Sequence, residues 1–146
     1  MLWQDCHQKS GGMFHCCDGA PQAPALLHNQ AELAMTLVSA YHATSEVRFL
    51  DRAKQLAEFI LAELKNPGGG FYDIPALATL ALGVRLTLIE QNGAAATFFC
   101  KLAHAAPDPR YQSAARHALS AFTGEFDSYG VHAAPFGSAL QVYLSG

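Results

Sequence analysis

Residues 40–60 read AYHATSEVRFLDRAKQLAEFI, and residues 102–122 read LAHAAPDPRYQSAARHALSAF. The second stretch repeats the first with an offset of 62 positions, so that histidine, arginine and aromatic side chains recur in register. The matched pairs include His42 with His104, Arg48 with Arg110 and Phe49 with Tyr111. A repeat of this length is typical of stacked supersecondary units, none of which buries its apolar face alone. The sequence therefore predicts an array of similar units.

Each unit of the array is expected to be a pair of antiparallel helices. Apolar side chains recur at steps of three and four along both halves of the first unit, and the link near Ser45 is too short for anything but a hairpin. We expect an all-α fold with helices at residues 26–43, 46–64, 93–105, 109–122 and 136–144. The repeat units are residues 11–69, residues 70–129 and a partial unit at 130–146.

Glycine-rich loops recur in register with these helices. They read SGGMFH at 10–15, GGGFYD at 68–73 and YGVH at 129–132. Glycine lets the chain leave a helix through backbone angles that a Cβ forbids. In an array of hairpins the loops share one end, where they form either a packed aromatic lid or a binding surface. Residues 76–93 are ambiguous, because VRLTLIE alternates like a strand whereas ALATLAL before it reads as a helical turn. We expect an extended connector before a helix that begins near Asn92.

Composition narrows the class of protein. Hydrophobic residues make up 51% of the 146 residues and charged residues only 14%, whereas soluble domains carry roughly 25% charge. The net charge is −3 and the sequence contains no basic stripe, which argues against binding to nucleic acid. It also contains no apolar run long enough to predict a membrane-spanning helix. The N-terminus lacks the pattern of a secretory signal, so we expect a cytoplasmic protein. Since neither MLWQDC nor PFGSALQVYLSG reads as a polar cap, we also expect a homodimer.

The first three cysteines suggest a metal site. With two histidines they form the pattern CH(x7)HCC, and the potential ligands are Cys6, His7, His15, Cys16 and Cys17. The spacing matches no standard zinc pattern, and adjacent cysteines do not easily point at one ion. The simpler interpretation is reduced thiols packed as small apolar side chains, with no metal and no cofactor.

The chain resembles the C-terminal helical region of the thioredoxin-domain-containing proteins of the spermatogenesis-associated type. The matching stretches, in order, are DGAPQAPALLHNQAELA, AYHATSEVRFLDRAKQLAEFI, GGGFYD, IEQNGAAA and YGVHAA. The resemblance spans nearly the whole chain from Gly11 onward. It implies a six-hairpin, (α/α)-toroid, glycosidase-like fold, of which this chain supplies about half. The matching region excludes the thioredoxin-like domain and contains no CxxC motif, so no redox role is implied.

The same resemblance bears on catalysis. Family members tend to read LLxDQA and EDNAxAA where this chain reads LLHNQA and EQNGAAA, which places Asn29 and Gln91 where acids are expected. If those acids exchange protons, this chain has lost both groups, because an amide does not titrate near neutral pH. The remaining carboxylate candidates for catalysis are Glu32, Asp73, Glu90 and Asp127, of which Asp73 is the best placed, and His28 is a candidate base. Asp73 and His28 each have a simpler interpretation as a capping residue. The candidates for ligand binding are Phe14, His15, Asn29, Phe71, Tyr72, Asp73 and Gln91.

Three functional hypotheses remain open. The leading one is a non-catalytic helical-repeat protein that self-associates and binds a small, sugar-like ligand at its glycine-loop end. The second is a carbohydrate-active hydrolase or epimerase whose pocket is shared between subunits. The third is the metal-binding module. The loss of two expected acids favours the first, whereas the loop aromatics, which suit sugar stacking, keep the second open.

Overall fold

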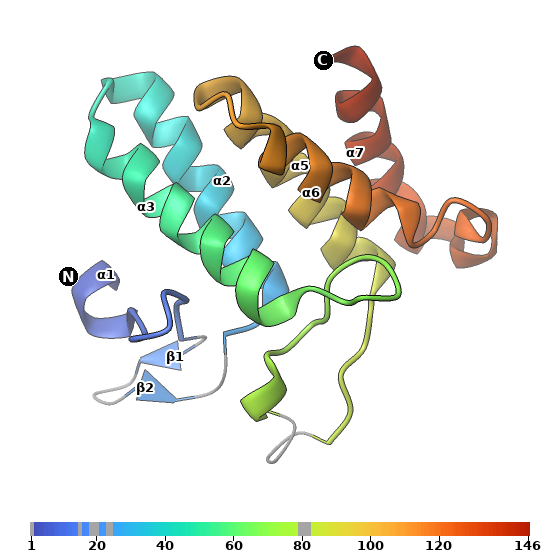
Figure 1. Cartoon of the computed structure of the whole chain (residues 1–146), viewed down its shortest axis with the longest axis horizontal. Coiled ribbons are helices and arrows are strands. Elements are labelled where there is room, and N and C mark those ends of the chain that lie inside the picture. Colours follow the sequence, from blue (N-terminus) through green and yellow to red (C-terminus); the bar gives the residue numbers. More distant parts are fainter. Residues whose placement is uncertain (1, 15, 18–20, 23–24, 79–82) are drawn as a thin grey trace.

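The computed structural model in Figure 1 describes residues 2–14, 16–17, 21–22, 25–78 and 83–146. Its elements, in chain order, are α1 (Leu2–Cys6), β1 (Cys16–Cys17), β2 (Pro21–Gln22), α2 (Leu27–Thr44), α3 (Val47–Phe59), the π-helical turn η1 (Ile60–Leu64), the 3₁₀ turn η2 (Ala76–Ala78), α5 (Ile89–Ala105), α6 (Pro109–Ser120), the 3₁₀ segment η3 (Phe126–Ala133) and α7 (Ala134–Ser145). The predicted all-α fold is confirmed. The two short strands pair antiparallel beside the first glycine loop.

The helices form two layers (Figure 1). The inner helices α2, α5 and α7 pack side by side, while α3 and α6 pack outside α2 and α5 respectively. The inner helices are parallel. Near their beginnings Gly93 of α5 lies against Pro135 and Phe136 of α7, and near their ends His42, His104 and Val142 line one small cavity. This arrangement of parallel inner helices with antiparallel outer helices is the expected array of hairpins.

Local chemistry sets the turn of each hairpin. In the first, Ser45 adopts a left-handed conformation (φ 58°) and its backbone N–H donates to the carbonyl of Tyr41, which closes the end of α2. In the second, the Asp108 carboxylate accepts from the backbone N–H of Arg110, and Pro109 occupies the first turn of α6. Two different turn chemistries therefore produce the same hairpin.

The third long helix begins earlier than predicted. Helix α5 starts at Ile89, because the alternating pattern ends at Leu88, whose backbone is still extended. The connector prediction is confirmed for residues 83–88, which form neither helix nor strand and alternate between exposed and half-buried side chains. The other long helices end within two residues of their predicted limits.

Close packing of α5 against α7 depends on small residues. A Cβ at Gly93 would lie 2.7 Å from the backbone nitrogen of Phe136, which is closer than atoms tolerate. Ala95 and Ala96 follow on the same buried helix, and Phe98 and Phe99 fill the core one turn later. Because α5 is buried on almost every side, it is the centre of the described fold.

The N-terminal segment covers part of α3 instead of ending in an open apolar face. The Trp3 ring stacks on His7 with centroids 4.8 Å apart, and the guanidinium of Arg52 lies 5.0 Å from the centre of the Trp3 ring. The expectation that the apolar side chains of MLWQDC are left uncovered is therefore wrong for Trp3. At the other end, Phe136 is buried and Leu144 is 74% exposed.

The cysteines differ from the reduced-thiol interpretation. Cys6 is disulfide-bonded, to a cysteine whose side chain lies outside the described part of the structure. Its sulfur is therefore not a free thiolate ligand. Among the described residues no group of three metal-ligating side chains occurs, and His15 lies outside them. Cys100 is a free, buried thiol whose pKa is raised by burial. None of the described helices is long and apolar enough to cross a membrane.

Candidate functional site

Two buried side-chain amides hold the glycine loops against the inner helices. In the first unit the Gln30 side chain accepts from the backbone N–H of Met13 (2.7 Å) and donates to its carbonyl (2.8 Å). In the second, Asn92 accepts from the N–H of Phe71 (2.7 Å) and donates to its carbonyl (3.0 Å). We call each of these paired contacts an amide clamp. Each clamp satisfies both backbone groups of a buried loop residue.

The two amide clamps occupy equivalent positions of the repeat. Gln30 and Asn92 are related by the same 62-position offset as the outer helices. The clamped loop residue precedes its amide by 17 positions in the first unit and by 21 in the second. The repeat therefore conserves the contact while the connector between loop and inner helix changes length. Both loops lie at the N-terminal ends of the inner helices, as the array predicted (Figure 1).

The clamps explain why amides occupy these positions. An amide both donates and accepts, whereas a carboxylate only accepts. An acid at position 30 or 92 would face a carbonyl oxygen without a proton to share. The neighbouring amides Asn29 and Gln91, which occupy the predicted acid positions, lie beside the clamps in the first turns of α2 and α5.

Phe71 is held in the core. Its ring has no exposed surface, stacks on Phe99 with centroids 5.6 Å apart and meets the ring of His117 edge-on at 5.5 Å. The amide clamp fixes the backbone of Phe71 so that its side chain turns inward, and the ring is closed to a ligand. In the first loop Phe14 is half-buried, and His15 lies outside the described residues.

Tyr72 is the aromatic residue of the second loop that reaches the surface. It is half-buried, and the Arg85 guanidinium lies 3.9 Å from the centre of its ring. Arg85 also donates to the carbonyls of Ile74 (2.9 Å) and Glu63 (2.8 Å), which fixes its position. One face of Tyr72 is therefore covered by a well-anchored cation.

Asp73 joins three parts of the chain. Its carboxylate accepts from the backbone N–H of Leu86 (2.7 Å), and its own N–H donates to the Leu86 carbonyl (2.8 Å). Its carbonyl accepts from the N–H of Leu27 at the start of α2 (2.9 Å). These bonds agree with a capping role for the acid, since one carboxylate oxygen is committed to the backbone.

The other candidates lie in the first turns of the inner helices. His28 is exposed, and Asn29 and Gln91 are half-buried. The Oε1 atom of Gln91 is buried and accepts no hydrogen bond from any described residue. A buried acceptor without a donor is unusual in a folded protein, and it marks Gln91 as the residue of this set with unused polar capacity.

One pair was missed by sequence reasoning. The Nδ1 atom of His132 lies 2.6 Å from the Oε1 atom of Glu90, and both side chains are more than half exposed. Glu90 begins α5 and His132 belongs to η3, 42 positions later. The third glycine motif, YGVH, contains the signal that could have found this pair, because the array brings that loop to the end where α5 begins. This carboxylate–imidazole pair is able to exchange a proton with a bound molecule.

A groove of about 630 Å³ lies between α3 and α6 and is lined by both helices and by Phe71 of the second glycine loop. A second hollow of about 330 Å³ lies at the opposite ends of the inner helices and includes His42 and His104. The Nδ1 atom of His104 lies 3.0 Å from the Cys100 carbonyl, in agreement with the structural role expected at a helix C-terminus.

The fold defined by these hairpins is a partial (α/α) toroid of the six-hairpin, glycosidase-like class. Among solved structures, the chain is similar to cellobiose 2-epimerase from Spirochaeta thermophila DSM 6192, with a TM-score of 0.66 and 18% identity over 83% of this chain. It is also similar to cellobiose 2-epimerase from Bacillus thermoamylovorans B4167, with a TM-score of 0.65 and 15% identity over 83% of this chain. A third similar structure is the unsaturated glucuronyl hydrolase from Bacillus sp. GL1, with a TM-score of 0.60 and 15% identity over 84% of this chain.

The extent of the likeness is limited. The matched region spans 34%, 35% and 37% of those three chains, which is less than the half toroid predicted from sequence. At these identities the likeness defines the fold alone. No protein-family model matches the sequence, and no curated protein matches it significantly.

Proposed function

We propose that this chain is a helical-repeat unit that binds a sugar-like ligand at its glycine-loop end and does not catalyse a reaction alone. The observation that carries the proposal is the convergence of two clamped glycine loops at one end of a fold shared with a cellobiose 2-epimerase and an unsaturated glucuronyl hydrolase. The half-buried Tyr72 beside Arg85 supplies an aromatic ring with a charged neighbour there.

The non-catalytic part of the proposal is supported by the polar groups at the two predicted acid positions and at Asp73. Amides occupy the two positions where acids are expected, and the Asp73 carboxylate is engaged by the Leu86 backbone. A glycoside hydrolase needs two carboxyl groups that are free to take and give protons across the bound sugar. Binding without turnover is therefore the simplest use of this surface.

Ligand-observed NMR tests the proposal. Saturation-transfer spectra with cellobiose and with glucuronate are expected to show contacts in the wild type and in Tyr41→Leu, which changes a half-buried tyrosine at the other end of α2. Tyr72→Leu is expected to lose the signal, because it removes the half-buried ring that reaches the surface at the loop. Equal transfer in both variants, or none in the wild type, would contradict a sugar site at the loops.

A second function is favoured by the Glu90–His132 pair. We propose as the alternative a hydrolase or epimerase whose pocket is completed by another subunit, with this pair as its proton-exchanging group. Activity towards cellobiose or an unsaturated uronoside should then fall on dilution as subunits separate, and should be lost in Glu90→Gln. Turnover unaffected by Glu90→Gln would rule out this pair.

Self-association is part of the first proposal. Residues 133–146 contain no charged side chain, and the outward side of α7 presents Gly137, Ser138 and the 74%-exposed Leu144. We propose that this side forms the interface of a dimer. Light scattering should give about twice the 15.6 kDa chain mass for the wild type and for the control Val47→Glu, whose exposed valine lies on α3. Leu144→Glu should shift it towards 15.6 kDa.

We also propose kinship with the helical region of the thioredoxin-domain-containing, spermatogenesis-associated proteins. The ordered match of LLHNQA, GGGFYD, IEQNGAAA and YGVHAA supports this relationship, since it includes both clamp amides, Gln30 and Asn92, and the second clamped loop. A structure of a family member should contain amides equivalent to Gln30 and Asn92 bonded to its glycine loops. Apolar residues at both places would argue against the kinship.

A further inference from the structure

A groove of about 630 Å³ runs along the outer layer between α3 and α6. Its walls are single faces of the two helices, at steps of three and four. The helical residues are Glu58 of α3, Leu61 and Ala62 of η1, Lys65 directly after η1, and Pro109, Arg110, Ser113, Ala114 and His117 of α6; Phe71 of the second glycine loop completes the lining. Its volume falls within the range of roughly 300–1,000 Å³ that is usual for small-molecule pockets. The toroid likeness does not account for it.

The groove exists because the outer helices pack on the inner layer and carry small residues between them. Ala62 and Ser113 are exposed, whereas Ala114, in the middle of α6, is buried. The α3 side is also distorted, because the helix passes into the π-helical turn η1 at Ile60. Such turns occur frequently at functional sites, where they re-aim the side chains of one helix face. Leu61 and Ala62, which line the groove, belong to this turn.

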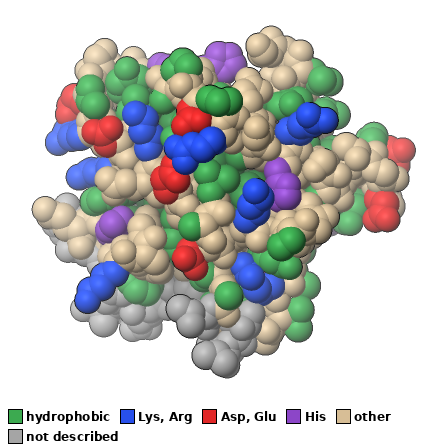
Figure 2. All heavy atoms as spheres, in the orientation of Figure 1, with side chains coloured by type: hydrophobic (Ala, Val, Ile, Leu, Met, Phe, Trp, Pro, Cys, Tyr) green, Lys and Arg blue, Asp and Glu red, His purple; other side chains and the backbone are tan. Residues whose placement is uncertain are grey.

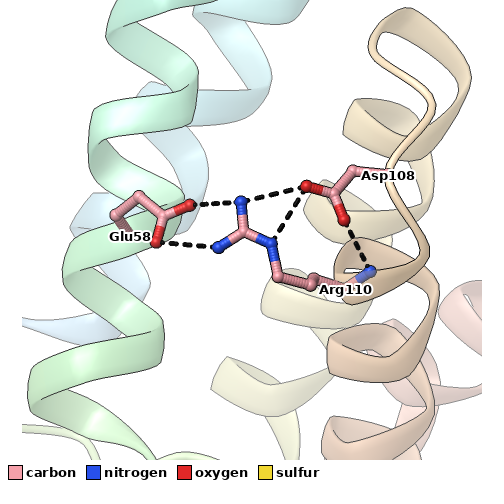
Figure 3. Close-up of polar contacts among 3 residues, drawn as sticks. All are labelled: Glu58, Asp108 and Arg110. Atoms are coloured by element: carbon pink, nitrogen blue, oxygen red, sulfur yellow. Dashed lines mark hydrogen bonds and ion pairs between the residues drawn. The ribbon is translucent and has the colours of Figure 1, made fainter.

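One end of the groove is closed by an ion-pair bridge of one arginine and two carboxylates (Figure 3). The Arg110 guanidinium lies between Glu58 on α3 (3.0 Å) and Asp108 before α6 (2.9 Å). The hydrogen bonds that Arg110 donates to Asp108 and Glu58 raise the pKa of Arg110, and the same bonds to Asp108 lower the pKa of its carboxyl group. Because two carboxylates pair with one cation, no unneutralised positive charge is available to a ligand at this end.

The other end has an unpaired cation. Lys65 is exposed, and no described carboxylate forms an ion pair with its ammonium group. His117 lies beside it on the opposite wall. Its Nε2 atom is 3.0 Å from the Asn66 carbonyl, an acceptor, so this nitrogen carries a proton. The edge-on contact with the buried Phe71 fixes the same ring. Figure 2 shows charged side chains of both signs, together with histidine, over the face that α3 and α6 form.

We propose that this groove binds a small amphipathic anion, a carboxylate carried on an apolar chain. The carboxylate pairs with Lys65, and the apolar body lies along Leu61, Ala62 and Ala114 towards the Arg110 bridge. A cationic head would be repelled by Lys65, and a neutral head would leave the ammonium without a partner. The apolar middle of the groove excludes a ligand that is polar throughout, so the site is distinct in chemistry from the proposed sugar surface.

The head-group requirement is tested with three ligands of one chain length. Titration calorimetry with dodecanoate, dodecanol and dodecyltrimethylammonium, each below its micelle-forming concentration, measures the contribution of the charge. We expect one dodecanoate per chain and weaker binding of the other two by about tenfold or more, which corresponds to one charge-assisted contact. Equal affinity for dodecanol, or no binding of dodecanoate, overturns the proposal.

Matched variants locate the site. Lys65→Met, which keeps the length of the side chain, should lose about tenfold in dodecanoate affinity. Lys54→Met, on α3 outside the groove, should not change it. Ser113→Phe fills the groove from an exposed position, and Ser120→Phe places the same ring at the end of α6 outside it. Binding should be abolished only in Ser113→Phe, with thermal unfolding showing that all four variants are folded. Unchanged binding in Lys65→Met or Ser113→Phe contradicts the assignment.

Discussion

The two complete hairpins, α2–α3 and α5–α6, have the same local design and different surroundings. Each inner helix holds a glycine loop with an amide clamp, and each outer helix begins with an acid two residues before an arginine. In the first hairpin Arg48 stays with its local partner Glu46, whereas in the second Arg110 also reaches Glu58 of the neighbouring hairpin. The repeat therefore specifies the hairpin, and the position in the array decides which of its contacts cross between hairpins.

Exchanging the amides for acids should break this equivalence most strongly. Asn92→Asp is expected to destabilise the fold by about 3–5 kcal/mol at pH 7, because it buries a charge without a compensating partner. Gln30→Glu should cost less. Gln30 donates to one carbonyl, whereas Asn92 donates to two, those of Phe71 and Leu88. Urea unfolding of both variants beside the wild type measures the two costs.

The acid variants also provide a pH test. A carboxyl group at position 92 faces carbonyl oxygens in a buried site, so its folded-state pKa should be raised above its unfolded value of about 3.9. The penalty is then full above the folded pKa and is relieved as the pH falls through it. Stability of Asn92→Asp relative to wild type should improve between pH 7 and pH 5. A gap that is independent of pH would mean that the residue has moved to solvent.

A smaller effect is expected from a methyl group in the loops. Gly70 has a φ of 70°, and a Cβ there would lie 2.8 Å from the clamp oxygen of Asn92. Its counterpart Gly12 lacks the positive φ, although a Cβ would lie 2.8 Å from the Phe59 ring. Both alanine variants should lose about 1–3 kcal/mol, with Gly70→Ala losing more because backbone strain adds to the contact.

A glycine of α7 is the control for these loop variants. Gly137 has open space around it and no positive φ. Gly137→Ala should therefore be neutral or stabilising by about 0.5–1 kcal/mol, as alanine is in an exposed helix. Denaturation midpoints of the three variants give the comparison. A Gly12→Ala cost above that of Gly70→Ala would show that ring packing outweighs the strained backbone.

The smallest effect is expected from the bridge between hairpins. Glu58→Gln should lower the thermal midpoint slightly and Glu46→Gln less still, because exposed ion pairs contribute little. The difference should shrink in about 1 M salt, where charges are screened within a few ångströms. Since its bonds to Arg110 lower the pKa of Asp108, the contribution of that carboxylate is present above its unfolded pKa and is lost as the pH falls below about 4. A difference in thermal midpoint that changes with neither salt nor pH would contradict an electrostatic origin.

The hairpins could be predicted from sequence because their signals are local. Helical periodicity, short turns and the 62-position offset are visible in the sequence alone, and the same offset relates Gln30 to Asn92. The sequence predicts the start of α5 too late, near Asn92, because an alternating connector leads directly into the helix at Ile89.

The contacts at the site could not be predicted in the same way. An amide clamp, the Glu90–His132 pair and the Arg110 bridge join residues 17, 42 and 52 positions apart. Helical periodicity marks none of these contacts, and the YGVH motif points only to the Glu90–His132 pair. Phe71 and Tyr72 are adjacent and similar in sequence, yet the clamp buries the first ring and leaves the second half-buried. Their different roles depend on the backbone direction, which the sequence pattern does not encode.

The Arg110 bridge makes the array directional. One repeat after Glu58 the chain has Ser120, so a hairpin placed beside α6 in the same register would find no carboxylate to receive its arginine. One repeat before Arg110 the chain has Arg48, which is already neutralised by Glu46. The Glu58–Arg110 ion pair therefore forms only between the first hairpin and the second, in that order. Identical copies of the chain stacked side by side in this register would not form the same ion pair at their junction. An ion pair that adds little stability thus makes the two lateral edges of the molecule chemically unequal and works against its indefinite polymerisation in this register.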